Sequence, residues 1–411
     1  MFRSFHLTSA ATAVALGLSS AASAQIADQS SPSKSGPSAV ETVTVTAQKL
    51  DAARAGIQTQ TGASTYTITS EDIEAAPGGS NNLLNSVILQ APSVTQDSYG
   101  QVHIRGEHNA LQYRLNGVII PEGISVFGQT LDPRLASSVK LIDGALPAEY
   151  GLVTGAIVDM QTKSGVFDQG GDISIYGGSH NTIEPGFDYG GSSGNFNYFV
   201  SGDFTRNDLG IESPDGSRNP IHDRTTQYHG FAYLEDILDD HSRITAILGT
   251  SHDDFEIPNN PGQTPSFVVN GQADFDSAKL DENQREITHY GILSYLHSAG
   301  QFDFQVSAFA RYSSLDFTPD VIGDLMFNGI AQDAYKRDTA FGMQAEGAYH
   351  LGDSHTIRGG IVVQTERATS KTTSQVLPAD CTGAGTMADP FACLPFSGNP
   401  AAPDYNPNFD V

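Results

Sequence analysis

Residues 302–312 read FDFQVSAFARY, and the alternation in this stretch decides the fold class. Its even-numbered positions, from Phe302 to Tyr312, are all apolar, whereas most of its odd-numbered positions are polar. Side chains of a β-strand point to its two faces in turn, so a period of two predicts a half-buried strand. The same alternation runs through residues 196–205 and 340–351, and each of the three runs has ten residues or more. Soluble strands usually have about five or six residues, whereas longer ones suit a tilted crossing of a hydrocarbon layer.

Connections of two different lengths join the alternating segments after residue 170. Tight polar turns lie at residues 194–195, 239–241, 299–300 and 352–354, and long polar loops lie around residues 207–225, 256–282 and 317–335. Short turns at one end and long loops at the other are typical of an outer-membrane β-barrel. A secreted soluble β-rich binding or structural protein would also alternate and is the alternative interpretation, but soluble strands are seldom this long.

The composition excludes two classes of protein. The 411 residues include 21 Lys and Arg against 47 Asp and Glu, which gives a net charge of −26. A nucleic-acid-binding protein needs clustered Lys and Arg to displace counterions from phosphate, so this class is excluded. No segment approaches the roughly 18 continuous apolar residues of a transmembrane helix, so a bundle of membrane helices is excluded as well.

The N-terminus has the parts of a secretory signal peptide over residues 1–24. A basic residue, Arg3, is followed by a short apolar stretch over residues 7–18 and by Ala22-Ser23-Ala24. This order of a positive start, a short apolar run and an Ala-x-Ala end predicts export with cleavage of the leader. Residues 25–49 then form a polar segment that we expect to be a flexible linker.

The end of this linker, residues 41–47, reads ETVTVTA. Alternating β-branched residues favour an extended strand. A strand on a flexible tether has unpaired N–H and C=O groups, so it can pair with the edge strand of a sheet in a partner protein. The first strand of the following domain is an equally good interpretation from composition alone.

Residues 50–166 have the mixed pattern of a small α/β domain. Thr69 followed by Asp72 predicts a capped helix start, and the apolar spacing in residues 81–89 predicts an amphipathic helix. Short strands are expected at residues 102–105, 113–115, 138–142 and 156–160. Asn116-Gly117 between two apolar segments predicts a tight hairpin turn.

Four segments of this domain resemble the TonB-dependent outer-membrane receptors. Residues 101–106 (QVHIRG), 113–118 (YRLNGV), 138–151 (SVKLIDGALPAEYG) and 155–163 (GAIVDMQTK) are similar, in order, to motifs of that family's plug domain. The matching motif positions are Arg105, Gly106, Asn116, Gly117, Gly144, Tyr150, Gly151, Gly155, Thr162 and Lys163. Asn116 stands where the family usually has Asp, Asp159 stands where it has Asn, and Gly155 is single where the family has a pair.

The resemblance implies the fold class, an α+β plug domain at residues 50–166 followed by a partial antiparallel transmembrane β-barrel at residues 170–411. It also implies a receptor in the cell outer membrane that imports a scarce ligand, such as a siderophore-type metal complex, cobalamin or a carbohydrate, by movement of the plug. The partners would be TonB, ExbB and ExbD, with no enzyme activity and no cofactor. The TonB-binding residues would be Thr42, Val43, Thr44, Val45, Thr46 and Ala47.

The number of strands raises a question of size. We count about nine long segments from residue 170 to residue 411. A barrel that encloses a plug has about 22 strands, whereas a small barrel is filled by its own side chains. We therefore expect the chain to hold a full plug and only part of a barrel, as in a truncated receptor.

Other chemistry finds little support in the sequence. Residues 190–194 (GGSSG) fit a nucleophile-elbow pattern around Ser192, but they lie in a turn between two expected strands rather than between a strand and a helix. His252, Asp253, Asp254 and Glu256 could bind a cation, but an ordinary solvated acidic loop is the better interpretation. The histidine pairs 103/108 and 289/297 lack partners at metal-ligand spacing. Cys381 and Cys393 lie close together in an exported chain, and we expect them to form a disulfide.

Overall fold

The computed structural model describes residues 39–58, 62–97, 101–107, 111–121, 123–352 and 354–377. The expected signal peptide, the expected linker up to residue 38 and the expected disulfide between Cys381 and Cys393 lie outside the described residues. The rest of the expected flexible linker, residues 39–49, belongs instead to a helix, α1 (Ala39–Ile57).

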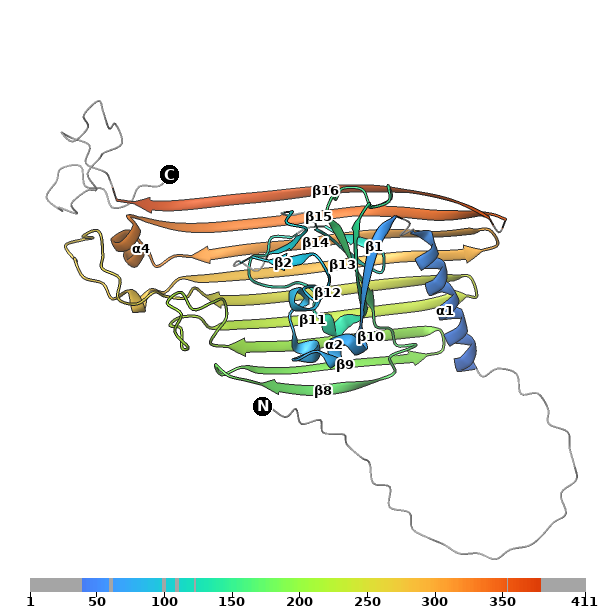
Figure 1. The fold of residues 1–411 in the computed structure, drawn as a ribbon, viewed down its shortest axis with the longest axis horizontal. Coiled ribbons are helices and arrows are strands. Elements are labelled where there is room, and N and C mark those ends of the chain that lie inside the picture. Colours follow the sequence, from blue (N-terminus) through green and yellow to red (C-terminus); the bar gives the residue numbers. More distant parts are fainter. Residues whose placement is uncertain are drawn as a thin grey trace, which may run out of the picture.

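Nine antiparallel strands after residue 170 form one large curved sheet (Figure 1). Their order in the sheet follows the sequence, so every neighbouring pair is a hairpin. The strands are β8 (Gly170–Gly177), β9 (Ile183–Ser193), β10 (Phe196–Asn207), β11 (Thr225–Asp239), β12 (Ser242–Glu256), β13 (Asn283–Ala299), β14 (Phe302–Thr318), β15 (Ile330–Leu351) and β16 (His355–Val376). Strands β8 and β16 are the two edges and do not pair with each other. The predicted partial antiparallel barrel is confirmed.

The two faces of this sheet invert the rule of soluble proteins. In β14 the odd-numbered residues from Gln305 to Leu315 are buried, including Ser307 and Arg311, whereas the apolar Phe302 is 44% exposed. Large apolar side chains such as Leu293 and Phe341 are also more than half exposed. Soluble strands bury their apolar face, so the exposed apolar face of this sheet matches the outer surface of a barrel in lipid.

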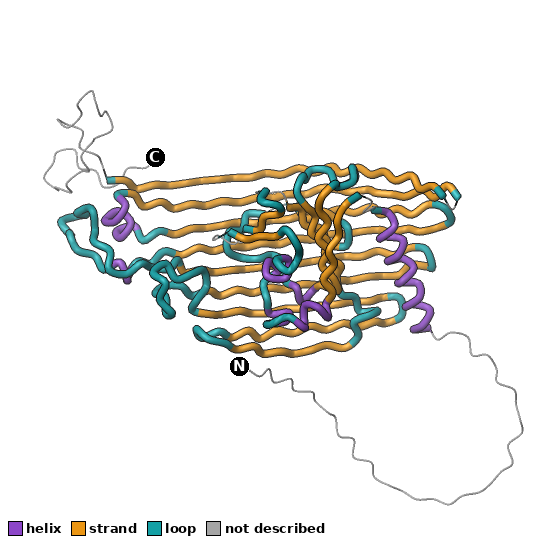
Figure 2. The backbone as a smooth tube through the Cα atoms, viewed as in Figure 1, coloured by secondary structure: helices purple, strands orange, loops and turns teal. Residues whose placement is uncertain are grey.

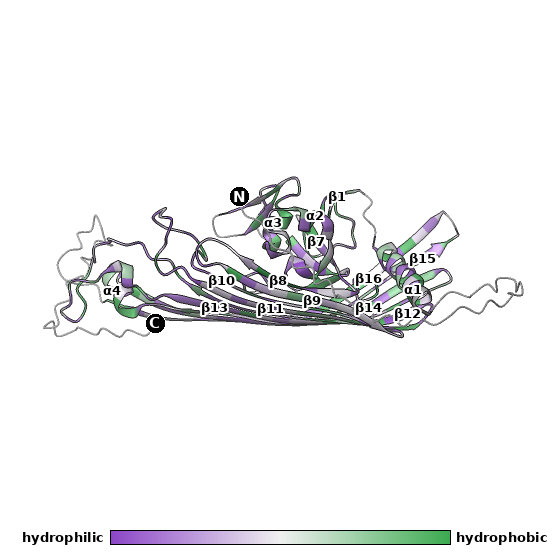
Figure 3. Ribbon diagram, turned by 90° about the horizontal axis from the view of Figure 1, so that it is seen from below, coloured by the Kyte–Doolittle hydropathy of each residue, from purple (hydrophilic) through white to green (hydrophobic). Residues whose placement is uncertain are grey.

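A smaller domain before residue 168 packs against the concave face of the large sheet (Figure 3). Its five-stranded sheet has the order β1-β6-β7-β4-β5, in which only β4 and β7 are parallel. The strands are β1 (Ala63–Thr69), β4 (Leu111–Leu115), β5 (Val118–Ile120), β6 (Ala136–Gly144) and β7 (Ala156–Thr162), with β2 (Val94–Gln96) pairing β3 (Val102–Ile104). Short helices complete it, namely α2 (Ser70–Ala75), η1 (Gly79–Asn81), α3 (Leu84–Ile88) and η2 (Pro133–Leu135).

Local signals in the sequence account for several of these elements. Thr69 and Asp72 form the predicted capping box at the start of α2. Asn116 and Gly117 have φ values of 51° and 80° and turn the chain between β4 and β5, as predicted. The helix expected over residues 81–89 is shorter, because the Asn82 side chain donates to the Pro77 carbonyl and holds the preceding chain in a turn.

One apolar cluster joins the small domain to the large sheet. Ile104, Leu115 and Met160 of the domain are buried together with Phe199 and Phe309 of the sheet. Because burying a large apolar side chain contributes about 1.5–3 kcal/mol, this shared core seats the domain on the sheet.

Two further helices lie at opposite ends of the strands (Figures 1 and 2). Helix α1 (Ala39–Ile57) lies at the end with the short turns, and helix α4 (Val321–Asn328) lies among the long loops. The sequence predicted only a loop at α4, which Asp320 caps at its start and Gly329 (φ 75°) ends. Among the described residues, no helix has both the length and the apolar character needed to cross a membrane.

Candidate functional site

The segment expected to bind TonB forms the first half of a helix, not a strand. Residues 42–47 belong to α1, in which Val43, Ala47 and Leu50 share one face. Ala47 and Leu50 are buried against Ile237 and Leu296 of the barrel wall. The expected strand is wrong here because no sheet edge pairs with this segment, and a helix satisfies its backbone groups internally. The β preference of its residues is weak and depends on context.

Three polar side chains of α1 bind the barrel wall and the small domain. Lys49 Nζ donates to the Asp240 carbonyl oxygen at 3.2 Å, in a short turn of the sheet. Asp51 pairs with Arg243 at 2.8 Å, and Arg243 is 2% exposed. Arg54 donates to the Gln161 side chain of β7 at 2.5 Å. Helix α1 is therefore attached to both the sheet and the small domain.

The carbonyl oxygen of Gly117 is the point where all three parts meet. It accepts hydrogen bonds from Gln58, which follows α1, at 3.1 Å, from Arg114 of β4 at 3.3 Å and from Gln344 of β15 at 3.0 Å. Gln58 also donates to the Glu346 carboxylate of β15 at 2.6 Å. The predicted Asn-Gly turn is thus more than a hairpin, because it joins the helix to the barrel wall.

Two departures from the family motif stabilise this turn. The Asn116 side chain donates to Thr162 Oγ1 at 2.9 Å and accepts from the Thr162 backbone N–H at 3.0 Å. Asp159 accepts from the Gly117 backbone N–H at 3.1 Å. An amide can both donate and accept, whereas an ionised carboxylate can only accept, so Asn116 suits the position that faces Thr162.

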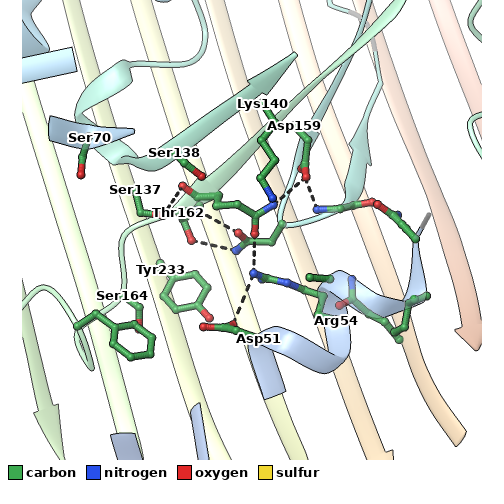
Figure 4. A pocket seen from close by; sticks show the side chains of 18 of the residues that line it. Asp51, Arg54, Ser70, Ser137, Ser138, Lys140, Asp159, Thr162, Ser164 and Tyr233 are labelled. Carbon is green, nitrogen blue, oxygen red and sulfur yellow. Dashed lines mark hydrogen bonds and ion pairs between the residues drawn. The ribbon is translucent and has the colours of Figure 1, made fainter. Parts of the chain in front are cut away.

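A polar cleft of about 520 Å³ lies between α1, the small domain and the barrel wall. Figure 4 shows Asp51 and Arg54 of α1 opposite Lys140 and Asp159 of the domain, with Tyr233 of the wall beside them. Movement of α1 would break its polar contacts with Gln161 and Arg243, and it would also expose the apolar face that packs on Ile237 and Leu296.

Of the remaining motif residues, Tyr150 also lines this cleft, and the others lie elsewhere in the small domain. Arg105 pairs with Asp143 at 3.1 Å next to the turn at Gly144, and Gly106 lies in the turn after β3. Arg114 lies over the Tyr150 ring at 4.8 Å, and burial raises the pKa of the Tyr150 phenol. The other three positions also lie close by: Gly151 accepts from Gln112, Gly155 directly precedes β7, and Lys163 lies 5.7 Å from the Phe199 ring.

A second attachment of the small domain was not predicted. The backbone N–H groups of Val126, Phe127 and Gly128 donate to the Glu286 carboxylate of β13 at 3.0–3.1 Å. Arg311 of β14 donates to the Pro121 carbonyl and pairs with Asp338 at 2.7 Å. No local pattern signals these contacts, because each joins residues more than 150 positions apart or on different strands.

The ion pair between Asp51 and Arg243 provides a test of α1 attachment. We expect Asp51→Asn to weaken the docking of α1 by up to about 1 kcal/mol, because Asp51 is partly exposed. Cleavage within α1 by a trace of protease should then become up to about fivefold faster. Asp172→Asn, on the exposed edge strand β8, is the control and should leave the cleavage rate unchanged. An unchanged rate in Asp51→Asn would show that the pair does not hold the helix.

The sequence matches no protein-family model and no curated protein. Solved structures do match. The ferric yersiniabactin uptake receptor FyuA from Yersinia pestis aligns with a TM-score of 0.56 at 14% identity, over 77% of this chain and 50% of that one. The siderophore receptor PiuA from Acinetobacter baumannii aligns at 0.53 and 17% identity, over 85% and 52%. The FrpB iron transporter from Neisseria meningitidis aligns at 0.57 and 14% identity, over 75% and 49%.

The chain has the fold of the TonB-dependent outer-membrane receptors. The matching structures named here are described as receptors or transporters, each for its own protein. The small domain corresponds to the plug, and the nine-stranded sheet corresponds to part of the barrel. The chain spans about half the length of the receptors that it matches.

Proposed function

We propose that this chain is part of an outer-membrane receptor, and that the receptor imports a scarce ligand with energy supplied through TonB. The observation that carries this proposal is the inverted burial of the large sheet. Large apolar side chains are exposed on its outer face, and many polar side chains, such as Ser307 and Arg311, are buried on the face toward the plug. A soluble protein would expose this apolar face to water at a large cost in free energy. In lipid the same face is stabilised.

The position of α1 supports coupling to TonB. Helix α1 lies at the end of the strands with the short turns, which is the periplasmic end in barrels of this kind. Its first residues, Thr42 to Ala47, are the proposed TonB-binding segment. We infer that TonB pairs with this segment by strand addition after it unwinds, and that ExbB and ExbD supply the work. A force on α1 would be transmitted to the plug through Arg54 and Gln58, and to the wall through the bond from Gln58 to Glu346.

The open sheet supports a barrel completed by further strands. Within the described residues, β8 and β16 each have one hydrogen-bonded neighbour. Unpaired backbone groups are very costly in lipid, so we propose that additional strands close the sheet around the plug. The long β16, whose outer face exposes Ile357, Ile361 and Val363, would then be an interior strand of the wall.

We propose a cargo of the siderophore-metal, cobalamin or carbohydrate class. The matching structures include a ferric yersiniabactin uptake receptor, a siderophore receptor and a copper transporter, and each description applies to its own protein. The strongly acidic chain, with a net charge of −26, favours the encounter with cationic or metal-bearing ligands.

Cell fractionation and uptake test the proposal together. We expect the protein to sediment with outer membranes and to require detergent for extraction. Deletion of its gene should remove uptake of one labelled compound from a panel of ferric siderophores, cobalamin and oligosaccharides. A protein that stays soluble without detergent, with an unchanged uptake panel, would instead support the secreted β-rich alternative.

A further inference from the structure

A cluster of two carboxylates and one imidazole lies between the plug and the barrel wall. Asp132 of the plug directly precedes η2, whereas Asp203 and His229 are cross-strand partners on β10 and β11. The ligand atoms of these three residues all lie within 4.8 Å of one another. They are separated by up to 97 positions in the sequence, so only the seated plug brings them together.

The cluster holds more negative charge than its neighbours balance. Asp253 of β12, which is 2% exposed, lies on the other side of His229, and Glu184 of β9 lies close by. The guanidinium of Arg134 acts electrostatically on Asp203, but it directs its two terminal nitrogens to Asn81 and Ser174 rather than to these carboxylates. Buried carboxylates need a cation or a proton, because an isolated charge in a poorly solvated site is very costly.

Two buried atoms of the cluster have no hydrogen-bond partner. His229 Nδ1 lies 2.8 Å from Asp203, but His229 Nε2 lies 3.7 Å from Asp253 Oδ1. Neither His229 Nε2 nor Asp253 Oδ1 has a hydrogen-bond partner, although both atoms are inaccessible to solvent. A buried polar atom without a hydrogen-bond partner costs about 1–3 kcal/mol. A small displacement of the imidazole that gave Nε2 a partner would therefore be favourable.

We propose that Asp132, Asp203 and His229 Nδ1 bind one divalent transition-metal ion of the zinc type, with Asp253 accepting a hydrogen bond from His229 Nε2. Ligand atoms around tetrahedral zinc lie about 3.4 Å apart, given bonds of about 2.0–2.1 Å. The imidazole must therefore move about 0.6 Å away from Asp203 to admit the ion. A movement of that size directed toward Asp253 would bring Nε2 to about 3.1 Å from Asp253 Oδ1, which is hydrogen-bond distance.

The chemistry of the ligands selects the class of ion. An imidazole nitrogen suits zinc and its first-row neighbours, whereas calcium and magnesium prefer oxygen ligands alone. A carboxylate that accepts from the second ring nitrogen is the usual companion of a metal-bound histidine. The bound ion would link the plug to strands β10 and β11, and so hold the plug in its seat.

Metal binding to the purified protein in detergent tests this site. After treatment with a chelator and dialysis against Zn²⁺, we expect one zinc per chain, and Co²⁺ should give a visible ligand-field absorption band. His229→Gln and Asp203→Asn should each weaken binding at least tenfold and remove the band. His350→Gln is the matched control, because His350 pairs with Asp303 at 2.8 Å on β14 and β15, away from the cluster.

A milder variant distinguishes the loss of metal binding from a loss of folding. Asp253→Asn leaves the three ligands in place and should weaken zinc binding about 10–100-fold, as for other second partners of metal-bound histidines, with an unchanged near-ultraviolet circular dichroism spectrum. If the wild-type protein takes up no zinc, the proposal is overturned, and the buried carboxylates are neutralised by protons instead of a metal ion. Equal binding by wild type and His229→Gln would overturn it as well. Neither outcome bears on ligand uptake.

Discussion

Deletion of residues Thr42 to Ala47 should abolish accumulation of the cargo by cells while leaving its binding at the cell surface unchanged. These residues lie in α1 at the short-turn end of the strands, whereas the long loops that would meet an external ligand lie at the opposite end (Figure 1). Removal of the segment takes away the attachment point for TonB but none of the loop residues. Uptake of labelled cargo should therefore fall to the level of cells that lack the gene.

A deletion of equal length provides the control for this experiment. Removing residues 28–33 shortens the preceding linker by the same six positions and leaves the proposed TonB-binding segment intact. Uptake should then stay close to that of the wild type. Surface binding should be measured for both variants in de-energised cells. Normal uptake after deletion of residues 42–47 would refute coupling through this segment.

Arg311→Met should lower the free energy of unfolding by about 3–5 kcal/mol. Arg311 and Asp338 are 2% and 3% exposed, and their side chains pair at 2.7 Å inside the barrel. Removing one partner of a buried pair leaves the other charge uncompensated, which is the expensive case. Arg311 also donates to the Pro121 carbonyl, so the variant loses a contact between the plug and the wall. Thermal unfolding in detergent, followed by circular dichroism, measures the effect.

Two further variants make this prediction specific. Arg285→Met breaks the pair with Asp254, but Arg285 is 58% exposed, so it should cost less than about 1 kcal/mol. The double variant Arg311→Met with Asp338→Leu removes both buried charges and should recover much of the lost stability. If Arg311→Met unfolds at the same temperature as the wild type, then Arg311 does not stabilise the barrel wall or its contact with Pro121 of the plug.

The sequence allowed good predictions wherever the pattern is local. Each strand of the barrel meets lipid on one face and the interior on the other, so its alternation is visible within ten residues, as at Phe302 to Tyr312. The capping box at Thr69 and the turn at Asn116 are local as well. The strand β1 was not predicted, because its pairing with β6 depends on residues about 75 positions away.

The helical state of residues 42–47 shows where local preference fails. Their β-branched residues favour a strand by small free energies only. Packing of Ala47 and Leu50 against Ile237 and Leu296 outweighs that preference in this state. Pairing with an edge strand of TonB would favour the strand over the helix, and this is how we expect TonB to act.

By itself, the sequence determined the long hairpins, the boundary between a mixed domain and an all-β region, and the turn residues, because each depends on neighbours along the chain. The tertiary structure alone decided how the plug sits on the wall. It made Gly117 a junction with α1 and β15, and it gathered Asp132, Asp203 and His229 into one cluster. Such contacts join distant segments whose proximity depends on the curvature of the sheet and on burial of a shared core, and neither leaves a periodic trace in the sequence.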